Sequence, residues 1–404
     1  METWLTYLAA FLLAGATAVA FPSSSVVLSA MKYLTAVLTD VAIFLFIPVL
    51  FITFTSGIAS LRKDGIGRKV FRTDLLWALV TTLVLAALAV VVSSVAEVSF
   101  PVTASAGGEY ISLYNEYTAS VDVLGVGEWM NNLFLPLLIF AFILGSALTP
   151  SADIIRPAYT VINSFSEVMY RIERTISYFG SFYVYVAGTA FFINLWQEKT
   201  FFVSPSFFVT LVISAVLLLV VVLPLLYAAF TGFSRNPYSV IGRGISCVLF
   251  ALVSGNIYAS ALQSEAINRC SLGVQKRIVS TSTPLGIIVD RGGTCFVSTV
   301  TVLALLRSLG AEVSTTALIA IALSTAVLSF ISFLSASGEV AVVTILLFKI
   351  LNINVYGAEA AVISVLPILN GIATVIDITI ISFAENITAK KTKTDITVPL
   401  KDSI

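Results

Sequence analysis

The feature that most constrains this chain is a series of long apolar segments, several of them long enough to cross a lipid bilayer. They lie near 4–21, 41–60, 75–96, 133–148, 175–195 and 206–230. A helix that spans the membrane needs about 20 consecutive apolar residues. Because the segment 133–148 is shorter than that, we expect its helix to extend further at one end. The sequence therefore predicts an all-α protein that crosses the membrane several times.

Composition supports a membrane protein and excludes several classes of function. Apolar residues make up 58% of the 404 residues and charged residues 11%, whereas about 25% of a soluble domain is charged. Lys+Arg and Asp+Glu both number 22, so we expect no nucleic-acid partner. Histidine is absent, and the three cysteines (Cys247, Cys270 and Cys295) are widely spaced. We therefore expect no metal site, no cofactor and no enzymatic activity.

The distribution of basic residues predicts the orientation in the membrane. The loop after the second segment, 61–72, carries five Lys or Arg residues, and none occurs in 73–155. Because basic residues concentrate on the cytoplasmic side, we expect 61–72 to be cytoplasmic and 98–127, a loop without a recognisable motif, to be extracellular. The lysine-rich C-terminus is then cytoplasmic. We interpret the N-terminal segment as a first span, in a multi-pass protein of the cell membrane.

After residue 240 the apolar segments are interrupted by small and polar residues. The interruptions are SGNIYAS (254–260), DRGGT (290–294) and SASGE (335–339). Backbone can leave the helix at membrane depth only where protein or a water-filled cavity satisfies its polar groups, and such breaks point to transporter binding sites. We predict two helical hairpins, 243–275 and 316–352, each followed by a polar helix, 278–308 (broken at DRGGT) and 357–388.

Seven segments, taken in order along the chain, point to one family. They are FLFIPVLFITFTSGIASL (44–61), LFLPLLIFAFILGSAL (133–148), FSEVMYRIERTISYFGSFYVYVA (165–187), NPYSVIGRGISCVLFALVSGN (236–256), TPLGIIVDRGGT (283–294), STAVLSFISFLSASGEVAVV (324–343) and ILNGIATVIDITIISFAENITAK (368–390). Together they resemble, as a divergent member, the dicarboxylate/amino acid:cation symporter family of the glutamate-transporter type.

The resemblance implies eight transmembrane helices plus two re-entrant helical hairpins, assembled as a homotrimer in the lipid bilayer. It also implies a division of the chain into a scaffold and a moving transport domain. The expected parts are scaffold spans 1 and 2 in 1–72, transport-domain span 3 in 73–97, the extracellular loop in 98–127, scaffold spans 4 and 5 in 128–200, the remaining transport domain in 201–390 and the cytoplasmic tail in 391–404.

The family resemblance places the substrate between the hairpin tips and the broken seventh span. The candidate substrate-binding residues there are Ser254, Asn256, Arg291, Thr294, Ser337, Gly338, Asn370 and Thr374. The candidate charge partners are Asp290, Asp377 and Glu339. Small residues at a hairpin tip also fit a tight turn without any ligand, so Ser337 and Gly338 have a purely structural interpretation as well.

The sequence departs from the family at its ion and substrate positions. Gly292 and Ile381 stand where the family has carboxylates that bind cations. Ala373 replaces the arginine that binds the substrate carboxylate, and Asn370 replaces an aspartate near the substrate amine. A hard cation needs several converging oxygen ligands. We therefore expect sodium coupling to be weak or absent, and coupling to protons stays open.

Arg291 is a new cation in the same region. A charge at mid-membrane costs about 2.5–3.5 kcal/mol on insertion scales, so it needs partners. We expect Asp377 to be the first partner and Glu339 the second. Arg291 can serve as a tethered cation in place of sodium, as a fork for the substrate carboxylate, or as both. A salt bridge that only holds the broken segment together is the alternative.

Three other carboxylates have competing interpretations. Glu339 can carry a proton or contact a substrate amine, or it can simply lie in a wet outer vestibule. Asp74 lies two residues after Arg72, so we expect an interfacial charge rather than a ligand. Glu385 lies near the inner end of the last helix, where we expect its side chain to reach water.

These observations favour a secondary-active transporter of a small carboxylate, working by elevator-type alternating access. A dicarboxylate is slightly favoured over an amino acid, because the positions that would read an α-amine are altered. The alternative is a transport-inactive or channel-like relative that serves as a sensor or an anion pore.

Overall fold

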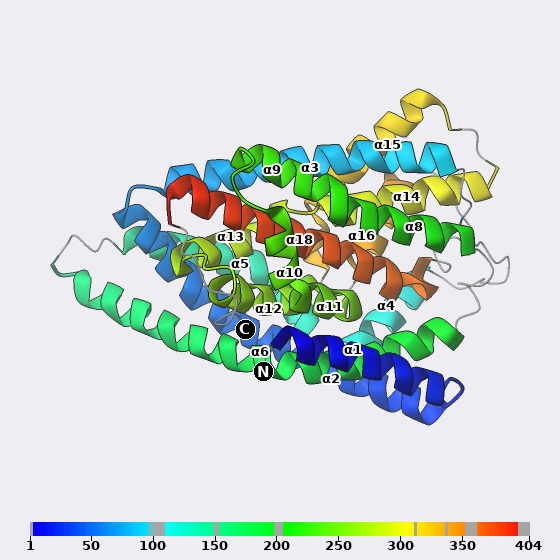
Figure 1. The fold of residues 1–404 in the computed structure, drawn as a ribbon, viewed down its shortest axis with the longest axis horizontal. Helices are drawn as coiled ribbons and strands as arrows, with labels where there is room; N and C mark the ends of the chain where they lie inside the picture. The colour runs from blue at the N-terminus through cyan, green and yellow to red at the C-terminus, as the bar shows by residue number, and fades with distance from the viewer. Residues whose placement is uncertain are drawn as a thin grey trace.

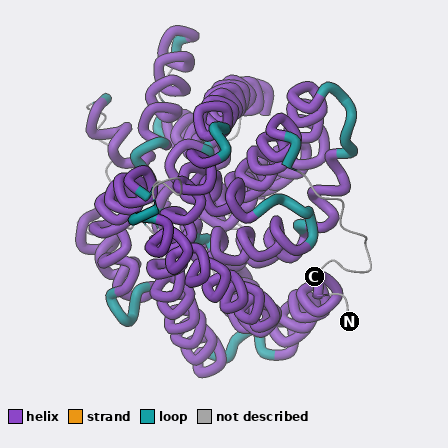
Figure 2. Tube along the Cα trace, turned by 90° about the vertical axis from the view of Figure 1, so that its left-hand side faces the viewer, coloured by secondary structure: helices purple, strands orange, loops and turns teal. Residues whose placement is uncertain are grey.

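The computed structural model describes residues 3–96, 100, 110–148, 153–197, 205–310, 313–335, 338–351 and 362–394. Within these ranges the chain is helical and contains no strand (Figures 1 and 2). The N-terminal half comprises α1 (Thr3–Ala20), α2 (Ser25–Lys63), α3 (Gly67–Ala96), α4 (Tyr110–Val121), α5 (Val126–Ala147), α6 (Arg156–Gln197), α8 (Pro205–Leu217), the π-helical turn η1 (Leu218–Val222) and α9 (Leu223–Thr231).

The C-terminal half is built from shorter helices and ends in one long helix. It comprises α10 (Pro237–Arg243), α11 (Ile245–Ser254), α12 (Ile257–Cys270), α13 (Lys276–Val289), α14 (Gly292–Ser308), α15 (Thr315–Ser329), the 3-10 turn η2 (Ser332–Leu334), α16 (Glu339–Ile350) and α18 (Leu366–Thr392). This arrangement confirms the all-α, glutamate-transporter-like fold class that the sequence predicts.

The described helices include seven spans that are long and apolar enough to cross a membrane, with α8, η1 and α9 counted as one span and α13 and α14 as another. The shorter α1 is the remaining apolar N-terminal helix. Two helices exceed the predicted segments by far: α2 has 39 residues and α6 has 42. At 1.5 Å per residue α2 is about 58 Å long, nearly twice the hydrocarbon thickness. In α2 the predicted segment 41–60 is the more buried part, whereas the residues added before it are mostly half-buried or exposed.

The chain between α3 and α5 contains a helix that the sequence analysis did not anticipate. The segment 98–127, expected as a loop without a motif, includes α4. After α4, the carboxylate of Asp122 accepts hydrogen bonds from the amides of Gly127 (3.0 Å) and Glu128 (2.8 Å) at the start of α5. Asp40 of α2 accepts one from the Leu124 amide (2.8 Å). The Asp40 contact holds the end of α4 against α2, and the Asp122 contacts fix the start of α5.

The helices pack in two groups. The α2 group consists of α1, α2, α5 and α6, and the α14 group consists of α3, α14, α15, α16 and α18. The hairpin helices α11 and α12 contact both groups, through α6 on one side and α18 on the other, and α13 contacts α2, α3 and α18. Figure 1 shows α3, α14 and α18 running side by side along the long axis.

Candidate functional site

The helix break predicted at 290–294 lies between α13 and α14. Asp290 and Arg291 leave the helix, with φ/ψ values of −88°/58° and −104°/30°. Helix resumes at Gly292, where the new N-terminus presents unpaired backbone amides. Gly293 lets this end approach α18: a Cβ there would collide with the Ala373 carbonyl and lie 2.6 Å from Ile376 Cβ. Two consecutive glycines thus bring the start of α14 against the last helix.

Asp377 of α18 caps the N-terminus of α14. Its Oδ1 accepts a hydrogen bond from the Gly293 amide (2.5 Å), and its Oδ2 accepts one from the Thr294 hydroxyl (2.7 Å). The Thr294 amide lies 3.3 Å from both oxygens. A carboxylate at a helix N-terminus is stabilised both by the amides and by the helix dipole. The predicted pair Thr294 and Asp377 therefore comes together at the break.

Arg291 is completely buried and lies between two carboxylates from different helices. Its Nη1 is 2.9 Å from Glu339 Oε2 and 3.8 Å from Asp377 Oδ2, and all three side chains are 0% exposed. Both expected partners are present, but Glu339 is the nearer one, which reverses the expected order. The vestibule interpretation of Glu339 is wrong. We call the two predicted hairpins hairpin 1 (243–275) and hairpin 2 (316–352); hairpin 2 places Gly338 and Glu339, at the start of α16, inward against the break, and Glu339 is fully buried.

The guanidinium keeps unused capacity to donate hydrogen bonds. Its contact with Glu339 lacks the alignment of a hydrogen bond, and Nε and Nη2 have no hydrogen-bond partner among the described residues. An arginine has five N–H donors in a planar fork that matches a carboxylate. The pairing in this conformation therefore neutralises Arg291 without saturating it.

Asp290 and Thr374 are buried but stand apart from that ion pair. Asp290 directs its carboxylate toward Gly286 in α13, where a Cβ would lie 3.0 Å from Oδ2, and no ion pair joins it to Arg291 in the described structure. The hydroxyl of Thr374 has no hydrogen-bond partner among the described residues. Ser337, the remaining candidate at the hairpin 2 tip, lies outside the described residues.

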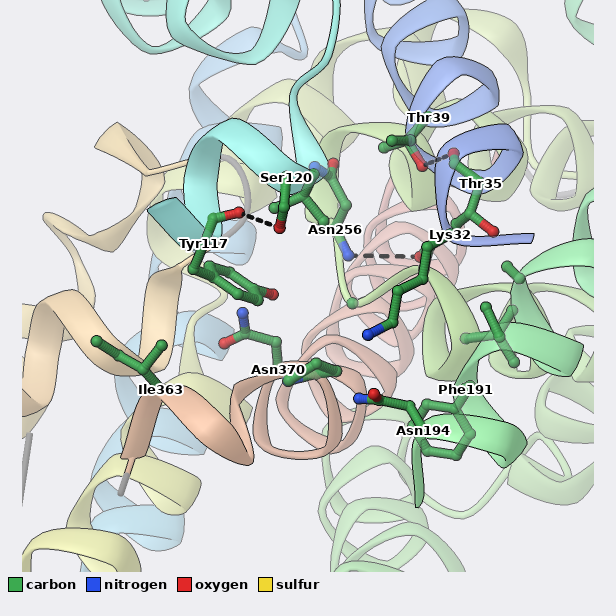
Figure 3. Close-up of a pocket in the computed structure, with 18 of the residues that line it drawn as sticks. Lys32, Thr35, Thr39, Tyr117, Ser120, Phe191, Asn194, Asn256, Ile363 and Asn370 are labelled. Carbon is green, nitrogen blue, oxygen red and sulfur yellow. Dashed lines mark hydrogen bonds between the residues drawn. The ribbon is translucent and has the colours of Figure 1, made fainter. Parts of the chain in front are cut away.

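The other three candidates line a cavity of about 350 Å³. Ser254 and Asn256 come from the tip of hairpin 1 and Asn370 from α18, and the opposite wall comes from α2, α4 and α6. In Figure 3 the ammonium of Lys32 and the side chains of Tyr117 and Asn370 point toward the same space. Arg291, Thr294 and Asp377 are not among the lining residues, so the candidates divide between an open cavity and a closed, charged centre.

Asn256 and Asn370 connect this cavity to the hairpins. Asn256 Oδ1 accepts hydrogen bonds from the amides of Tyr258 (3.0 Å) and Ala259 (3.1 Å) and so caps α12. Asn370 Oδ1 accepts one from the Val340 amide in the first turn of α16 (3.3 Å). The Tyr258 hydroxyl in turn donates to the Phe333 carbonyl, which joins hairpin 1 to hairpin 2.

Sequence reasoning misplaced two inner carboxylates. Asp74, expected at the interface, is 3% exposed and accepts hydrogen bonds from the hydroxyls of Ser282 (2.6 Å) and Thr388. Glu385, expected to reach water, is fully buried, with donors Asn268 (2.7 Å) and Thr283 (2.6 Å). Two features of the sequence could have indicated these contacts: the polar run STST (280–283) and the polar residue Asn268. Hydrogen-bond donors of this kind within apolar helices imply that an acceptor lies nearby.

Comparison with known families agrees with this geometry. A model of the family described as "SDF: Sodium:dicarboxylate symporter family" matches residues 4–391, nearly the whole chain. The comparison with curated proteins gave no match.

Proposed function

We propose that this protein carries a small carboxylate by elevator-type alternating access. The premise is that the chain belongs to the sodium:dicarboxylate symporter family and is therefore a multi-pass membrane transporter of a small molecule. The observation that carries this proposal is the buried Arg291 at the break between α13 and α14, between Glu339 of hairpin 2 and Asp377 of α18. A dicarboxylate or an amino acid is the proposed substrate.

In the first of its two proposed roles, Arg291 acts as a tethered cation. Its charge offsets those of Glu339 and Asp377, which would otherwise be buried without compensation at high cost. Support comes from Ile381, which stands where the family has a cation-binding carboxylate: its side chain fills the space beside Gly286, 2.7 Å from a Cβ built there. An apolar group at that point removes an oxygen ligand, so we propose weak or absent sodium coupling.

In the second role, Arg291 receives the substrate carboxylate when hairpin 2 opens. Glu339 lies on the first turn of α16, so it leaves the guanidinium if the hairpin moves away. Its carboxylate thus occupies the position that a substrate carboxylate would take. The cavity lined by Lys32, Asn256 and Asn370 is the proposed entry site, where the charge of Lys32 attracts an anion.

For the moving part we propose the α14 group together with the hairpins, and for the scaffold the α2 group. The two packing groups support this division, because the helix of 67–96 packs against helices of 292–392 although almost 200 residues, including α5 and α6 of the other group, separate them in sequence. A homotrimer and a cytoplasmic C-terminus complete the proposal. The mass of the purified complex and the accessibility of cysteines introduced after 394 would test these two points.

The decisive experiment is uptake of labelled dicarboxylates and amino acids into proteoliposomes, with and without sodium. We expect saturable uptake that sodium changes little. Arg291→Lys keeps the positive charge but loses the planar guanidinium that binds a carboxylate through two N–H groups. Uptake by this variant should still be independent of sodium, while its KM for substrate rises. Glu339→Gln should lower KM, since it removes the competing carboxylate.

Other results would redirect or overturn the proposal. Uptake that rises steeply with sodium would remove the tethered-cation role. An unchanged KM in Arg291→Lys would remove the carboxylate fork. Conductance without saturable counterflow would favour the anion-pore alternative over a carrier.

A further inference from the structure

A second cavity, of about 550 Å³, lies where α2 and α6 meet the end of hairpin 1 and the start of α13. Its volume falls in the range of small-ligand sites. It shares no lining residue with the cavity at the tip of hairpin 1, and the residues of the Arg291 centre do not line it. The proposed transport mechanism gives this cavity no role.

The wall of this second cavity carries mostly positive charge. Its charged lining residues are Lys63 of α2, Arg269 of α12, Lys276 and Arg277 of α13, and one carboxylate, Asp64. Lys63 and Asp64 are exposed, so a ligand can reach the cavity from solvent. A wall of this kind attracts anions and supplies several charge-assisted hydrogen-bond donors.

Two of the cations converge on a single oxygen atom. Arg269 Nη2 and Lys276 Nζ lie 3.7 and 3.4 Å from the same atom, Oε2 of Glu167 in α6. That oxygen marks a point at which the two side chains stabilise negative charge. The Glu167 side chain is 48% exposed, so it can turn into solvent and leave the point to an incoming anion.

The arginines at this cavity are held in place before any ligand binds. Arg269 stacks on the ring of Tyr170, with its guanidinium carbon 3.2 Å from the ring centroid. Arg277 pairs with Asp64, and its Nε donates to Gln275 Oε1 at 3.0 Å. Side chains that are already positioned lose less conformational entropy when they bind.

Lys63 is the cation with unused donors. Its ammonium group forms no ion pair and no hydrogen bond among the described residues, and an ammonium group has three N–H donors. Lys63 also lies in 61–72, the loop that the sequence predicts to be cytoplasmic. Basic pockets between membrane helices on that side bind the head groups of anionic lipids.

Two buried acids do not block this site. Glu173 of α6 and Glu265 of α12 interact electrostatically with the two converging cations, but each is 1% exposed and neither lines the cavity. No ion pair joins them to those cations in the described part of the chain. They lower the local positive potential and occupy none of the N–H donors. Arg174 of α6, an exposed residue that interacts with Tyr170, adds a positive charge.

We propose that this second cavity binds a phosphate group, held by Lys63, Arg269 and Lys276 after Glu167 has turned away. The head group of an anionic lipid and a dissolved phosphate both offer this chemistry. Because Lys63 lies on α2 and Arg269 on hairpin 1, the bound group bridges the proposed scaffold and the proposed moving part and stabilises their present arrangement. That consequence rests on the proposed function, whereas the binding site does not.

Thermal unfolding of the purified full chain in a neutral detergent tests the site without transport, because a ligand that binds only the native state raises the midpoint. The first probe is inorganic phosphate, compared with chloride at equal ionic strength. The second is phosphatidylglycerol in mixed micelles, compared with phosphatidylcholine. A specific rise with either probe supports the site and identifies the source of the phosphate group. The absence of a rise beyond the chloride and phosphatidylcholine controls would overturn the proposal.

Three variants locate the binding. Lys63→Gln should raise the ligand concentration for half-maximal stabilisation about fivefold. Arg68→Gln, which changes an exposed cation of α3 that does not line the cavity, is the matched control and should leave it unchanged. Glu167→Gln should lower it, because the competing carboxylate is gone; a purely structural role of Glu167 would give no such gain. Equal weakening in Lys63→Gln and Arg68→Gln, or no gain in Glu167→Gln, would exclude this cavity as the site.

Uptake into proteoliposomes tests the bridge between the two parts. The probe that binds in detergent should slow uptake by the wild type and slow it less in Lys63→Gln. If binding is present but the protein takes up no carboxylate, the proposed function fails and the phosphate site stands. Uptake that the bound probe does not slow would remove the bridging consequence.

Discussion

The centre around Arg291 and the inner pair Asp74 and Glu385 bury carboxylates in two different ways. At the centre, a fixed guanidinium compensates Glu339 and Asp377. In the inner region, neutral hydroxyl and amide groups do so, each carboxylate accepting two hydrogen bonds. The carboxylates held by neutral donors need no counter-charge. In the mechanism that we propose, by contrast, the guanidinium at the centre becomes available to the substrate when hairpin 2 moves away. The neutral donors around Asp74 and Glu385 suit a fixed structural role, whereas the ion pairs of Arg291 suit the transport role that we propose.

The largest effect should come from removing the cation. Arg291→Met leaves Glu339 and Asp377 buried without compensation, and breaking a buried ion pair costs about 3–5 kcal/mol. We expect a large fall in the thermal midpoint in detergent, together with stabilisation by sodium that the wild type lacks. The exposed Arg171→Met is the control and should change neither. Full stability of Arg291→Met without added cations would show that Glu339 and Asp377 do not depend on the guanidinium.

In the inner region the effect of one substitution should be smaller. Ser282→Ala removes one of two donors to Asp74, and leaving a buried polar group unsatisfied costs about 1–3 kcal/mol. Sodium should not restore the loss. Ser298→Ala, which removes a buried hydroxyl without a hydrogen-bond partner among the described residues, is the matched control. Equal unfolding midpoints for the two variants would mean that the donors to Asp74 do not matter.

A third change tests how closely α14 must approach α18. In Gly293→Ala the new Cβ would lie 2.9 Å from Asp377 Oδ1 and collide with the Ala373 carbonyl, so overpacking should cost about 1–3 kcal/mol. At Gly242 of α10 no atom lies within 4 Å of the corresponding Cβ. There alanine should stabilise by about 0.5–1 kcal/mol. Thermal unfolding of both variants measures the difference between their midpoints. Equal midpoints would show that α14 does not pack tightly against α18 at Gly293.

The smallest expected effect concerns the hairpin 1 tip. Asn256→Ala removes the cap of α12, which should cost about 1 kcal/mol, while Asn256→Asp keeps an acceptor and should lose less. Because Asn256 also lines the cavity, both variants should alter substrate KM. Identical midpoints for the two variants would show that the cap contributes nothing.

Much of the fold follows from local properties of the sequence. The apolar segments and the break at DRGGT were predicted, because bilayer thickness sets helix length and because glycines beside two charged residues disfavour a continuous helix. The partners of Arg291 were also predicted, although not their order, since distance depends on how far hairpin 2 folds inward. The extra lengths of α2 and α6 were not, because a helix can continue well past the apolar run that marks its span.

The errors at Asp74 and Glu385 have one cause. Each was judged by its neighbours along the chain, Arg72 and the terminal lysines, which point to an interface. The donors that bury them come from elsewhere: Ser282 is 208 positions from Asp74, and Thr283 is 102 from Glu385. No local pattern reports such a contact.

The sequence by itself determined that this chain is a helical membrane protein, where its helix breaks, and that a lone arginine at the break requires acidic partners, because bilayer hydropathy and the cost of a buried charge act locally. The tertiary structure alone decided which carboxylates meet Arg291 and which are satisfied by hydroxyl and amide groups. Those outcomes depend on how distant helices pack, since a buried charge is compensated by whatever group lies nearest in space.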